Sequence, residues 1–432
     1  MENSIPLNKY SKVKPNWAFF LYFSVMFVLY THTYIQLGIQ LFIIAYVILT
    51  KFFNGKIVLK KSTLKNILFI CLWFGLFTLL LFLSTKLWAY STMSNSKTML
   101  GVFRCFVIGF AIFVYADTTE RALSVMQSFA LASVIMGIAA MVTTPVSQYF
   151  QAGDEGFGQA IGQQRNLVGA VSTYMIFTCY FLKKYTNFKY GYFLMVFFIV
   201  LSVVTGSRSS LVQLILLLAM FIVFDRNYFR MITKLLGIVL LGTIAVVMLK
   251  NIPILYENIW IRFEDMFTTM SGDEVADAST LGRQFYREIA FEMLKKRPVL
   301  GWGLDGFYCY LRDYPMYKGY YIEAVYSHCS WAETMASLGT VGLLVWYIPH
   351  IYILGGNIKY FYSHPLMKYT CFLFISLVIM DYARLPWMSH PGCYQFFVLF
   401  ALILNLVRDA QYYKKTLTDK VNNSYETESI NG

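Results

Sequence analysis

The sequence predicts an all-α integral membrane protein of about twelve transmembrane helices, with one large extracytoplasmic loop between the ninth and the tenth helix. The first observation is composition, because 58% of the 432 residues are apolar and 14% are charged, whereas soluble chains carry roughly 25% charge. The second is length, since apolar runs long enough to cross a hydrocarbon core of ~30 Å recur along most of the chain. The third is the placement of basic residues, which concentrate in alternate connections.

Nine of the expected spans precede the one long polar block of the chain. They cover residues 17–31, 33–50, 64–84, 99–116, 122–142, 166–182, 190–205, 209–224 and 235–250. Three more follow the block, over residues 331–354, 368–385 and 392–407. The first span is expected to serve as the targeting signal, because it lacks a small-residue cleavage site and is followed by further spans.

The distribution of Lys and Arg predicts that both termini are cytoplasmic, since short cytoplasmic loops collect basic residues. In that orientation the inner segments, together with the basic tail from Arg408, hold Lys9, Lys12, Lys14, Lys51, Lys56, Lys60, Lys61, Lys65, Lys183, Lys184, Lys189, Arg226, Arg230 and Lys234. The short outer loops hold few basic residues, chiefly Lys86, Lys97, Arg165 and Arg208. Topology and contact with anionic lipid explain most of the net charge of +13, so no nucleic-acid partner is expected.

The spans are predicted to form one polytopic domain over residues 1–408, followed by a cytoplasmic tail of residues 409–432. The tail is polar and lacks periodicity, which is typical of a disordered segment. Within the domain, residues 251–330 form the polar block that is placed outside the membrane. Residues 282–296 of this block mix apolar and charged side chains as an amphipathic helix does, and we expect this helix to lie flat on the membrane.

The seven cysteines include no CxxC pair and no Cys/His spacing typical of a metal site, so neither a metal nor another cofactor is expected. Five of them lie in or beside spans. Cys309 and Cys329 both fall in the outer block, where a disulfide between them is a candidate cross-link.

Three segments carry a more specific pattern. The first is Thr205–Leu211, at the outer start of a span, and the second is Gly282–Arg283 followed one helix later by Pro298–Gly303. The third leads into an apolar span and consists of His328, Glu333, Gly339 and Gly342. In this order, with about twelve spans and a large outer loop, the segments resemble the O-antigen ligase and polysaccharide polymerase family of bacterial envelope glycosyltransferases.

The resemblance implies a donor glycan linked through pyrophosphate to a polyprenol such as undecaprenol, and transfer of that glycan to a hydroxyl group of an acceptor sugar. Arg208 and Arg283 match the family's segments and are the leading candidates to bind the pyrophosphate, with Arg165 and Arg287 as weaker candidates. Arginine suits this role because its planar guanidinium pairs with two phosphate oxygens and stays charged. The alternative for each is an arginine that extends to lipid head groups and does nothing more.

An acceptor hydroxyl must lose its proton as it attacks, so a general base is expected beside it. His328 is the first candidate and Glu333 the second, while the alternative for His328 is a polar cap on the turn into the tenth span. Asp381 and Arg384 lie three residues apart near an outer span end and are interpreted as a structural ion pair.

The predicted function is metal-independent transfer or polymerisation of lipid-linked oligosaccharide at the outer face of the bacterial cytoplasmic (inner) membrane. A repeat-unit polymerase for O-antigen, capsule or exopolysaccharide is favoured, and the alternative is an O-antigen ligase that attaches glycan to a terminal acceptor. Candidate protein partners are a chain-length regulator and a flippase.

Two functions from other classes of membrane protein remain as alternatives. A transporter or flippase for lipid-linked sugar would also be basic and have about twelve spans, but it would be expected to carry ionisable groups deep in several spans and a two-fold repeat. A sensor or scaffold would need a cytoplasmic output domain, and the sequence supplies no support for one.

Overall fold

The computed structural model describes residues 10–52, 60–89, 96–149, 156–223, 228–271, 278–315, 326–388 and 390–430. Within these ranges the chain is helical and contains no strand. Seven helices are long and apolar enough to cross a membrane, and four further apolar helices have between 10 and 17 residues. The chain is therefore an all-α, multi-pass membrane protein, as the sequence predicts.

A helix lies over every apolar run that is expected to be a span. Before the polar block these helices are α1 (Trp17–Val28), α2 (Thr33–Phe52), α3 (Lys61–Ile70), α4 (Leu76–Leu87), α5 (Ser96–Tyr115), α6 (Thr119–Thr143), α7 (Arg165–Thr186), α8 (Gly191–Val204), α9 (Arg208–Val223) and α10 (Tyr228–Asn251). After the block come α15 (Ser330–Lys359), α16 (Pro365–Met380) and α17 (His390–Ile430). A π-helical turn, Cys71–Gly75, joins α3 to α4. The number of helices that cross the membrane stays a prediction.

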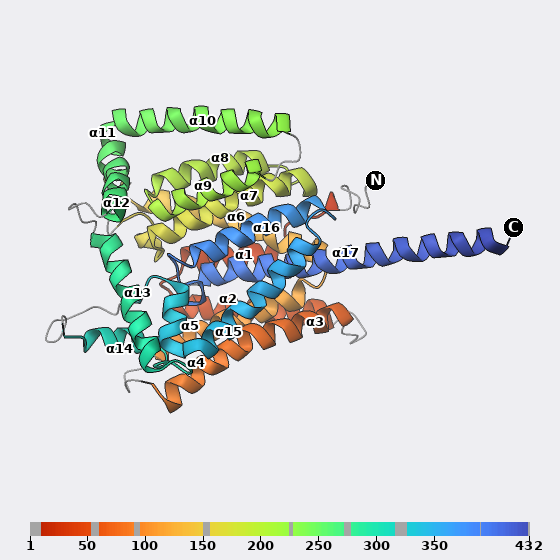
Figure 1. Ribbon diagram of the computed structural model, residues 1–432, viewed down its shortest axis with the longest axis horizontal. Helices are drawn as coiled ribbons and strands as arrows, with labels where there is room; N and C mark the ends of the chain where they lie inside the picture. The colour runs from red at the N-terminus through yellow and green to blue at the C-terminus, as the bar shows by residue number, and fades with distance from the viewer. Residues whose placement is uncertain are drawn as a thin grey trace.

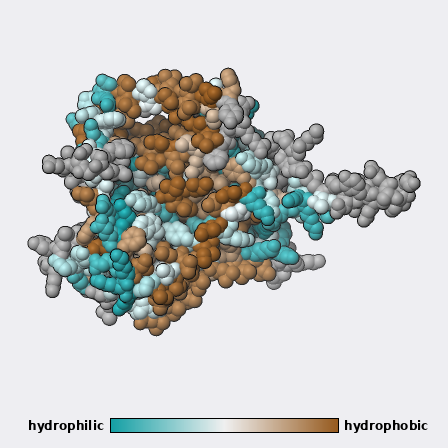
Figure 2. All heavy atoms as spheres, in the orientation of Figure 1, coloured by the Kyte–Doolittle hydropathy of each residue, from teal (hydrophilic) through white to brown (hydrophobic). Residues whose placement is uncertain are grey.

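The polar block is itself mostly helical. It contains α11 (Pro253–Leu255), a π-helical turn (Tyr256–Trp260), α12 (Ile261–Ser271), α13 (Ala278–Lys296) and α14 (Gly306–Arg312). Figure 1 shows that α11, α12 and α13 cross one end of the helix bundle, which we call the α13 end, and that α17 leaves the bundle at the opposite end. On the face shown in Figure 2, apolar residues form a broad band with hydrophilic residues gathered on either side of it, as expected of a membrane protein.

Helix α15 is broken at Gly339. This residue has φ 62° and ψ −155°, a backbone conformation that is essentially restricted to glycine. The break leaves carbonyl groups before it and N–H groups after it without partners inside the helix. Backbone N–H and C=O groups in folded proteins are almost always paired, so other parts of the protein are expected to bind them.

The missing partners come from Pro298–Gly303, the turn that follows α13. Four backbone hydrogen bonds close the break, Trp302 N to Ala336 O at 2.9 Å, Gly303 N to Ser337 O at 2.8 Å, Thr340 N to Pro298 O at 2.8 Å and Val341 N to Val299 O at 3.2 Å. The two backbones approach closely because Gly301 has no side chain. A Cβ at Gly301 would lie 2.6 Å from the Gly339 nitrogen. The loop and the broken helix therefore form one unit.

The apolar face of α13 packs on this unit. Ile289 and Met293 are buried in a cluster with Trp302, Phe307 and Met335. The indole N–H of Trp302 donates to the Met293 carbonyl at 2.8 Å. We expected lipid to cover this face, and the structure supplies protein instead. Amphipathic periodicity identifies an apolar face but does not distinguish a membrane from a neighbouring helix.

Helix α17 continues without interruption to Ile430, so most of the segment that is predicted to be disordered is helical in the structure. No Gly or Pro occurs between Cys393 and Ile430 to end the helix. The lack of apolar periodicity argues against a packed face in this segment, but it does not prevent a helix. The cytoplasmic location of the tail stays a prediction.

Gly339→Ala is expected to lower the free energy of unfolding by about 2 kcal/mol or more, because alanine is strained at this backbone conformation and its Cβ would lie 2.5 Å from the Val299 oxygen. Thermal unfolding of detergent-purified protein measures the effect. Gly355→Ala is the matched control on the same helix, because a Cβ there meets open space. The control should be as stable as the wild type or slightly more stable. An unchanged melting temperature for Gly339→Ala would contradict this account of the break.

Candidate active site

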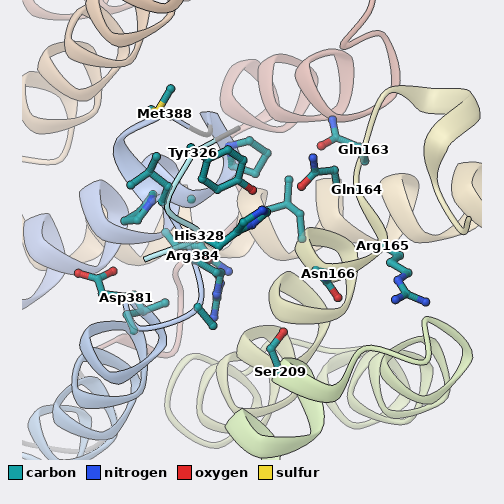
Figure 3. Close-up of a pocket in the computed structure, with 18 of the residues that line it drawn as sticks. Gln163, Gln164, Arg165, Asn166, Ser209, Tyr326, His328, Asp381, Arg384 and Met388 are labelled. Carbon is teal, nitrogen blue, oxygen red and sulfur yellow. Dashed lines mark hydrogen bonds between the residues drawn. The ribbon is translucent and has the colours of Figure 1, made fainter. Parts of the chain in front are cut away.

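A cavity of about 770 Å³ opens among the helix ends and turns near α13. Four of the residues that the sequence marks as site candidates line it, namely Arg165, Arg208, Arg283 and His328. They come from the starts of α7 and α9, from α13 and from the turn before α15. Segments more than a hundred residues apart in the sequence therefore meet at one cavity (Figure 3).

Two of these arginines begin helices. Arg165 is the first residue of α7, which has 22 residues, and Arg208 is the first residue of α9, which has 16. The N-terminus of a helix carries unpaired N–H groups and a partial positive charge, so it attracts anions. At both positions the guanidinium and the helix end add charge of the same sign. This part of the cavity is suited to a negatively charged group.

The turn between α8 and α9 is fixed against α7. Gly206 has φ 56°, a left-handed conformation that glycine adopts readily and that lets the chain reverse. Ser207 Oγ donates to Asn166 Oδ1 at 2.9 Å. Gly169 on α7 lies so near this turn that a Cβ would stand 2.4 Å from the Ser210 oxygen. The starts of the two helices are therefore held together.

His328 is held between two tyrosines. Its ring stacks on Tyr286 of α13 with centroids 6.3 Å apart and an angle of 17° between the planes, and its centroid is 4.2 Å from that of Tyr326. The backbone of His328 is left-handed, with φ 54°, which is uncommon for a residue other than glycine.

Glu333 does not line the cavity. It is only 4% exposed, and its Oε2 accepts a hydrogen bond from the backbone N–H of Ser327 at 2.8 Å. The Ser327 hydroxyl donates to the Cys329 carbonyl at 2.9 Å. These bonds fix the residues on either side of His328. The structure therefore brings Glu333 to the backbone that supports His328 and not to the cavity.

Arg287 does not line the cavity either. Its guanidinium lies over the ring of Tyr382, with 4.5 Å between the guanidinium carbon and the ring centroid. This cation–π contact ties α13 to the turn after α16. The i,i+4 spacing explains the difference from Arg283, because Arg287 is one helical turn further along α13.

Arg384 also lines the cavity, which the sequence did not predict. Asp381 and Arg384 do not form the ion pair that we expected. Asp381 accepts a hydrogen bond from the Tyr347 hydroxyl at 3.1 Å, whereas Arg384 donates to the side-chain oxygen of Gln213 at 2.9 Å. The i,i+3 argument assumed a helix, but α16 ends at Met380, so the two side chains share no helical face. An arginine at the outer end of a span was the only signal in the sequence.

Cys329 and Cys309 are separate buried thiols in the structure, so the disulfide that the sequence suggested is wrong. Burial raises the pKa of the Cys329 thiol to about 11, which keeps it protonated and unreactive near neutral pH. Across the described ranges, no group of three or more His, Cys, Asp or Glu residues is arranged to hold a metal ion.

Comparison with known families adds a finding that is independent of this geometry. The model of the O-antigen ligase family matches residues 193–347. This part of the chain is therefore similar to the O-antigen ligase family, as the motifs of the sequence indicate. No curated protein matches it.

The O-antigen ligase match runs from α8 into α15 and includes Arg208, Arg283, His328 and the break at Gly339. Arg165 and Arg384 lie outside it. The match supports glycan transfer of the ligase or polymerase type in general.

Glu333→Ala is expected to lower the free energy of unfolding by about 1–3 kcal/mol, because the buried N–H of Ser327 loses its acceptor. Glu333→Gln keeps an oxygen at the same position and should retain most of the stability. Thermal unfolding of both purified variants tests this. Equal losses for the two substitutions would show that the hydrogen bond to Ser327 is not what Glu333 contributes.

Proposed function

We propose that the protein is a metal-independent glycosyltransferase that polymerises polyprenyl-pyrophosphate-linked oligosaccharide repeats at the extracytoplasmic face of the bacterial cytoplasmic membrane. The product would be O-antigen, capsule or exopolysaccharide. One observation carries the proposal, which is that Arg208, Arg283 and His328 line a single cavity and all lie in the part of the chain that the O-antigen ligase family model matches. The α13 end of the bundle would face the outside, as the distribution of basic residues predicts.

Arg208 and Arg283 are the proposed pyrophosphate clamp. Negative charge grows on the phosphate oxygens as the anomeric C–O bond breaks, and fixed cations stabilise that charge. Arg208 would act together with the N-terminus of α9. Arg165 is proposed to bind the same anion from the start of α7, in a weaker role at the side of the cavity away from His328 (Figure 3).

His328 is the proposed general base. In the reaction, the acceptor oxygen forms a bond to the anomeric carbon and its proton passes to a nitrogen of His328. The bond from the anomeric carbon to phosphate breaks, and the polyprenyl pyrophosphate leaves with the electron pair. The proton then returns to solvent or to the leaving phosphate. The balance requires no oxidant, reductant or metal.

Glu333 and Arg287 receive different roles in this proposal from those that the sequence suggested. Glu333 is proposed to position His328 through its hydrogen bond to Ser327, since the carboxylate is buried and is absent from the cavity lining. Arg287 is proposed to hold α13 in place through its contact with Tyr382. Neither is now assigned to the reacting groups.

An O-antigen ligase is the second candidate, because ligases and polymerases share this chemistry and differ in the acceptor. A polymerase uses another lipid-linked repeat, whereas a ligase uses a terminal acceptor. A chain-length regulator and a flippase are proposed partners of the polymerase.

One observation favours a transporter of lipid-linked sugar, namely the broken helix α15, since transporters use discontinuous helices at their binding sites. In this chain, however, the free backbone groups of the break bind Pro298–Gly303 and are not left to bind a substrate. Two of the cavity arginines, Arg165 and Arg208, also lie at the starts of helices, whereas transport would favour ionisable groups deep within several spans. These two observations support the enzyme over the transporter.

Arg208→Ala and Arg283→Ala are each expected to reduce the rate of glycan transfer by about 10²–10³-fold, because each removes a fixed cation that stabilises the leaving pyrophosphate. The protein level in the membrane should not change. Arg312→Ala is the control, because Arg312 lies on α14, pairs with the adjacent Asp313 and does not line the cavity. Full activity in both cavity variants would rule out the clamp.

Purified protein in liposomes, supplied with a short lipid-pyrophosphate-linked oligosaccharide as the only substrate, should produce a ladder of multiples of the repeat. Separation of products by size measures it. His328→Ala should reduce the yield by about 10²–10⁴-fold. Product that forms only after a terminal acceptor is added would indicate a ligase. Movement of the donor across the bilayer without covalent product would indicate a transporter.

A further inference from the structure

In the part of the chain that the structure describes, no ion pair neutralises the positive charge of Arg384. Its Nη2 donates to Gln213 Oε1 at 2.9 Å and its Nη1 donates to Gln395 Oε1 at 3.5 Å. Both acceptors are neutral amides. No carboxylate among the described residues forms an ion pair with Arg384, and Asp381 attracts it only through space. A half-buried cation without a paired anion is unfavourable, so an anionic ligand would stabilise this arrangement.

The neighbouring carboxylate is occupied elsewhere. Asp381 accepts the hydroxyl hydrogen of Tyr347 on α15, and its backbone carbonyl accepts the N–H of Ser330 at 2.7 Å. These two bonds hold the start of α15 against the turn that follows α16. The Asp381 carboxylate therefore helps to hold α15 against the turn after α16. Arg384 and Asp381 both line the cavity, and the charge of Arg384 remains directed to it.

The main amide partner of Arg384 is itself fixed in orientation. Gln213 is fully buried on α9, and its Nε2 donates to the Ser376 hydroxyl on α16 at 3.4 Å. This bond directs Oε1 of Gln213 toward Arg384. A glutamate at this position would hold the guanidinium equally well but would cancel its charge. The glutamine positions the cation and preserves its charge.

The place of Arg384 in the cavity differs from that of Arg165. In Figure 3, Arg384 lies on the same side of the cavity as His328, and Arg165 lies on the other side. In the proposed reaction the acceptor loses its proton to His328, so the anomeric carbon and the phosphate bonded to it must lie on that side. A cation there acts on the charge that develops as the bond breaks.

We propose that Arg384 is a further anion-binding residue of the cavity, which binds the phosphate group bonded to the sugar of the donor and stabilises the leaving pyrophosphate. This inference rests on the proposed function. The ligand class is a pyrophosphate diester. The residue lies beyond the part of the chain that the O-antigen ligase family matches.

Binding of inorganic pyrophosphate to the detergent-purified full-length protein, measured by isothermal titration calorimetry, is the primary test. Arg384→Gln should weaken the affinity by about tenfold or more, since a charged hydrogen bond is lost. Gln213→Glu should weaken it to a similar extent, because the new carboxylate neutralises a guanidinium that stays in place. Arg312→Gln, on α14 and outside the cavity lining, is the control and should bind as the wild type does. Melting temperatures measured without ligand report whether each variant is folded.

Unchanged affinity in both Arg384→Gln and Gln213→Glu would overturn the inference, and so would a wild-type protein that does not bind pyrophosphate at millimolar concentration. If Arg384→Gln does not fold, Gln213→Glu decides the question. Displacement of pyrophosphate by glucuronate in the wild type but not in Arg384→Gln would assign the residue to the carboxylate of an acidic sugar, which also overturns the assignment to phosphate.

Measurement of glycan-transfer rates tests the role of Arg384 separately from the proposed function on which it rests. In the liposome assay, Arg384→Gln should lower kcat by about tenfold or more with a smaller change in KM, whereas Arg165→Gln should act mainly on KM. Wild-type turnover that Arg384→Gln does not alter would overturn the inference alone. Pyrophosphate binding that depends on Arg384, in a wild-type protein that transfers no glycan, would overturn the proposed function and leave the anion site standing.

Discussion

The closure of a broken membrane helix by a loop is the interaction on which the rest of the structure depends. The backbone groups that the break at Gly339 leaves without partners inside α15 are bound by Pro298–Gly303. That loop begins where α13 ends, and α13 packs its apolar face on the first half of α15. Helix α13, which carries Arg283, and the start of α15, which follows His328, are consequently parts of one packed unit.

A second constraint brings the start of α9 to that unit. Helices α7 and α9 approach closely at Gly169, and the chain between α8 and α9 reverses through the left-handed Gly206. Both helices begin with an arginine, so their backbone ends and side chains add charge of the same sign. The cavity lies where these helix starts meet the loop unit. Its positive character follows from packing and from charge together.

The acidic side chains near the cavity are used for support. Glu333 binds the N–H of Ser327, and Asp381 binds the hydroxyl of Tyr347. Neither forms an ion pair with an arginine of the cavity in the described part of the chain. A carboxylate placed against those guanidinium groups would neutralise the charge that an anionic ligand needs. These two carboxylates therefore support the backbone around the cavity.

The sequence by itself determined the class of protein, the run of helices, the resemblance to the O-antigen ligase family and three residues of the cavity lining within the family match. Composition, apolar length and local motifs are encoded within short stretches. Only the tertiary structure decided which motif residues line the cavity and which support it. Glu333 and Arg287 lie in the same motifs as His328 and Arg283, yet they point to backbone and to Tyr382. The sequence spacing predicted an ion pair between Arg384 and Asp381. The structure has none because α16 ends before these residues, so they do not share a helical face. Side-chain direction depends on where helices end and on which distant segment packs beside them, and neither is a property of sequence spacing.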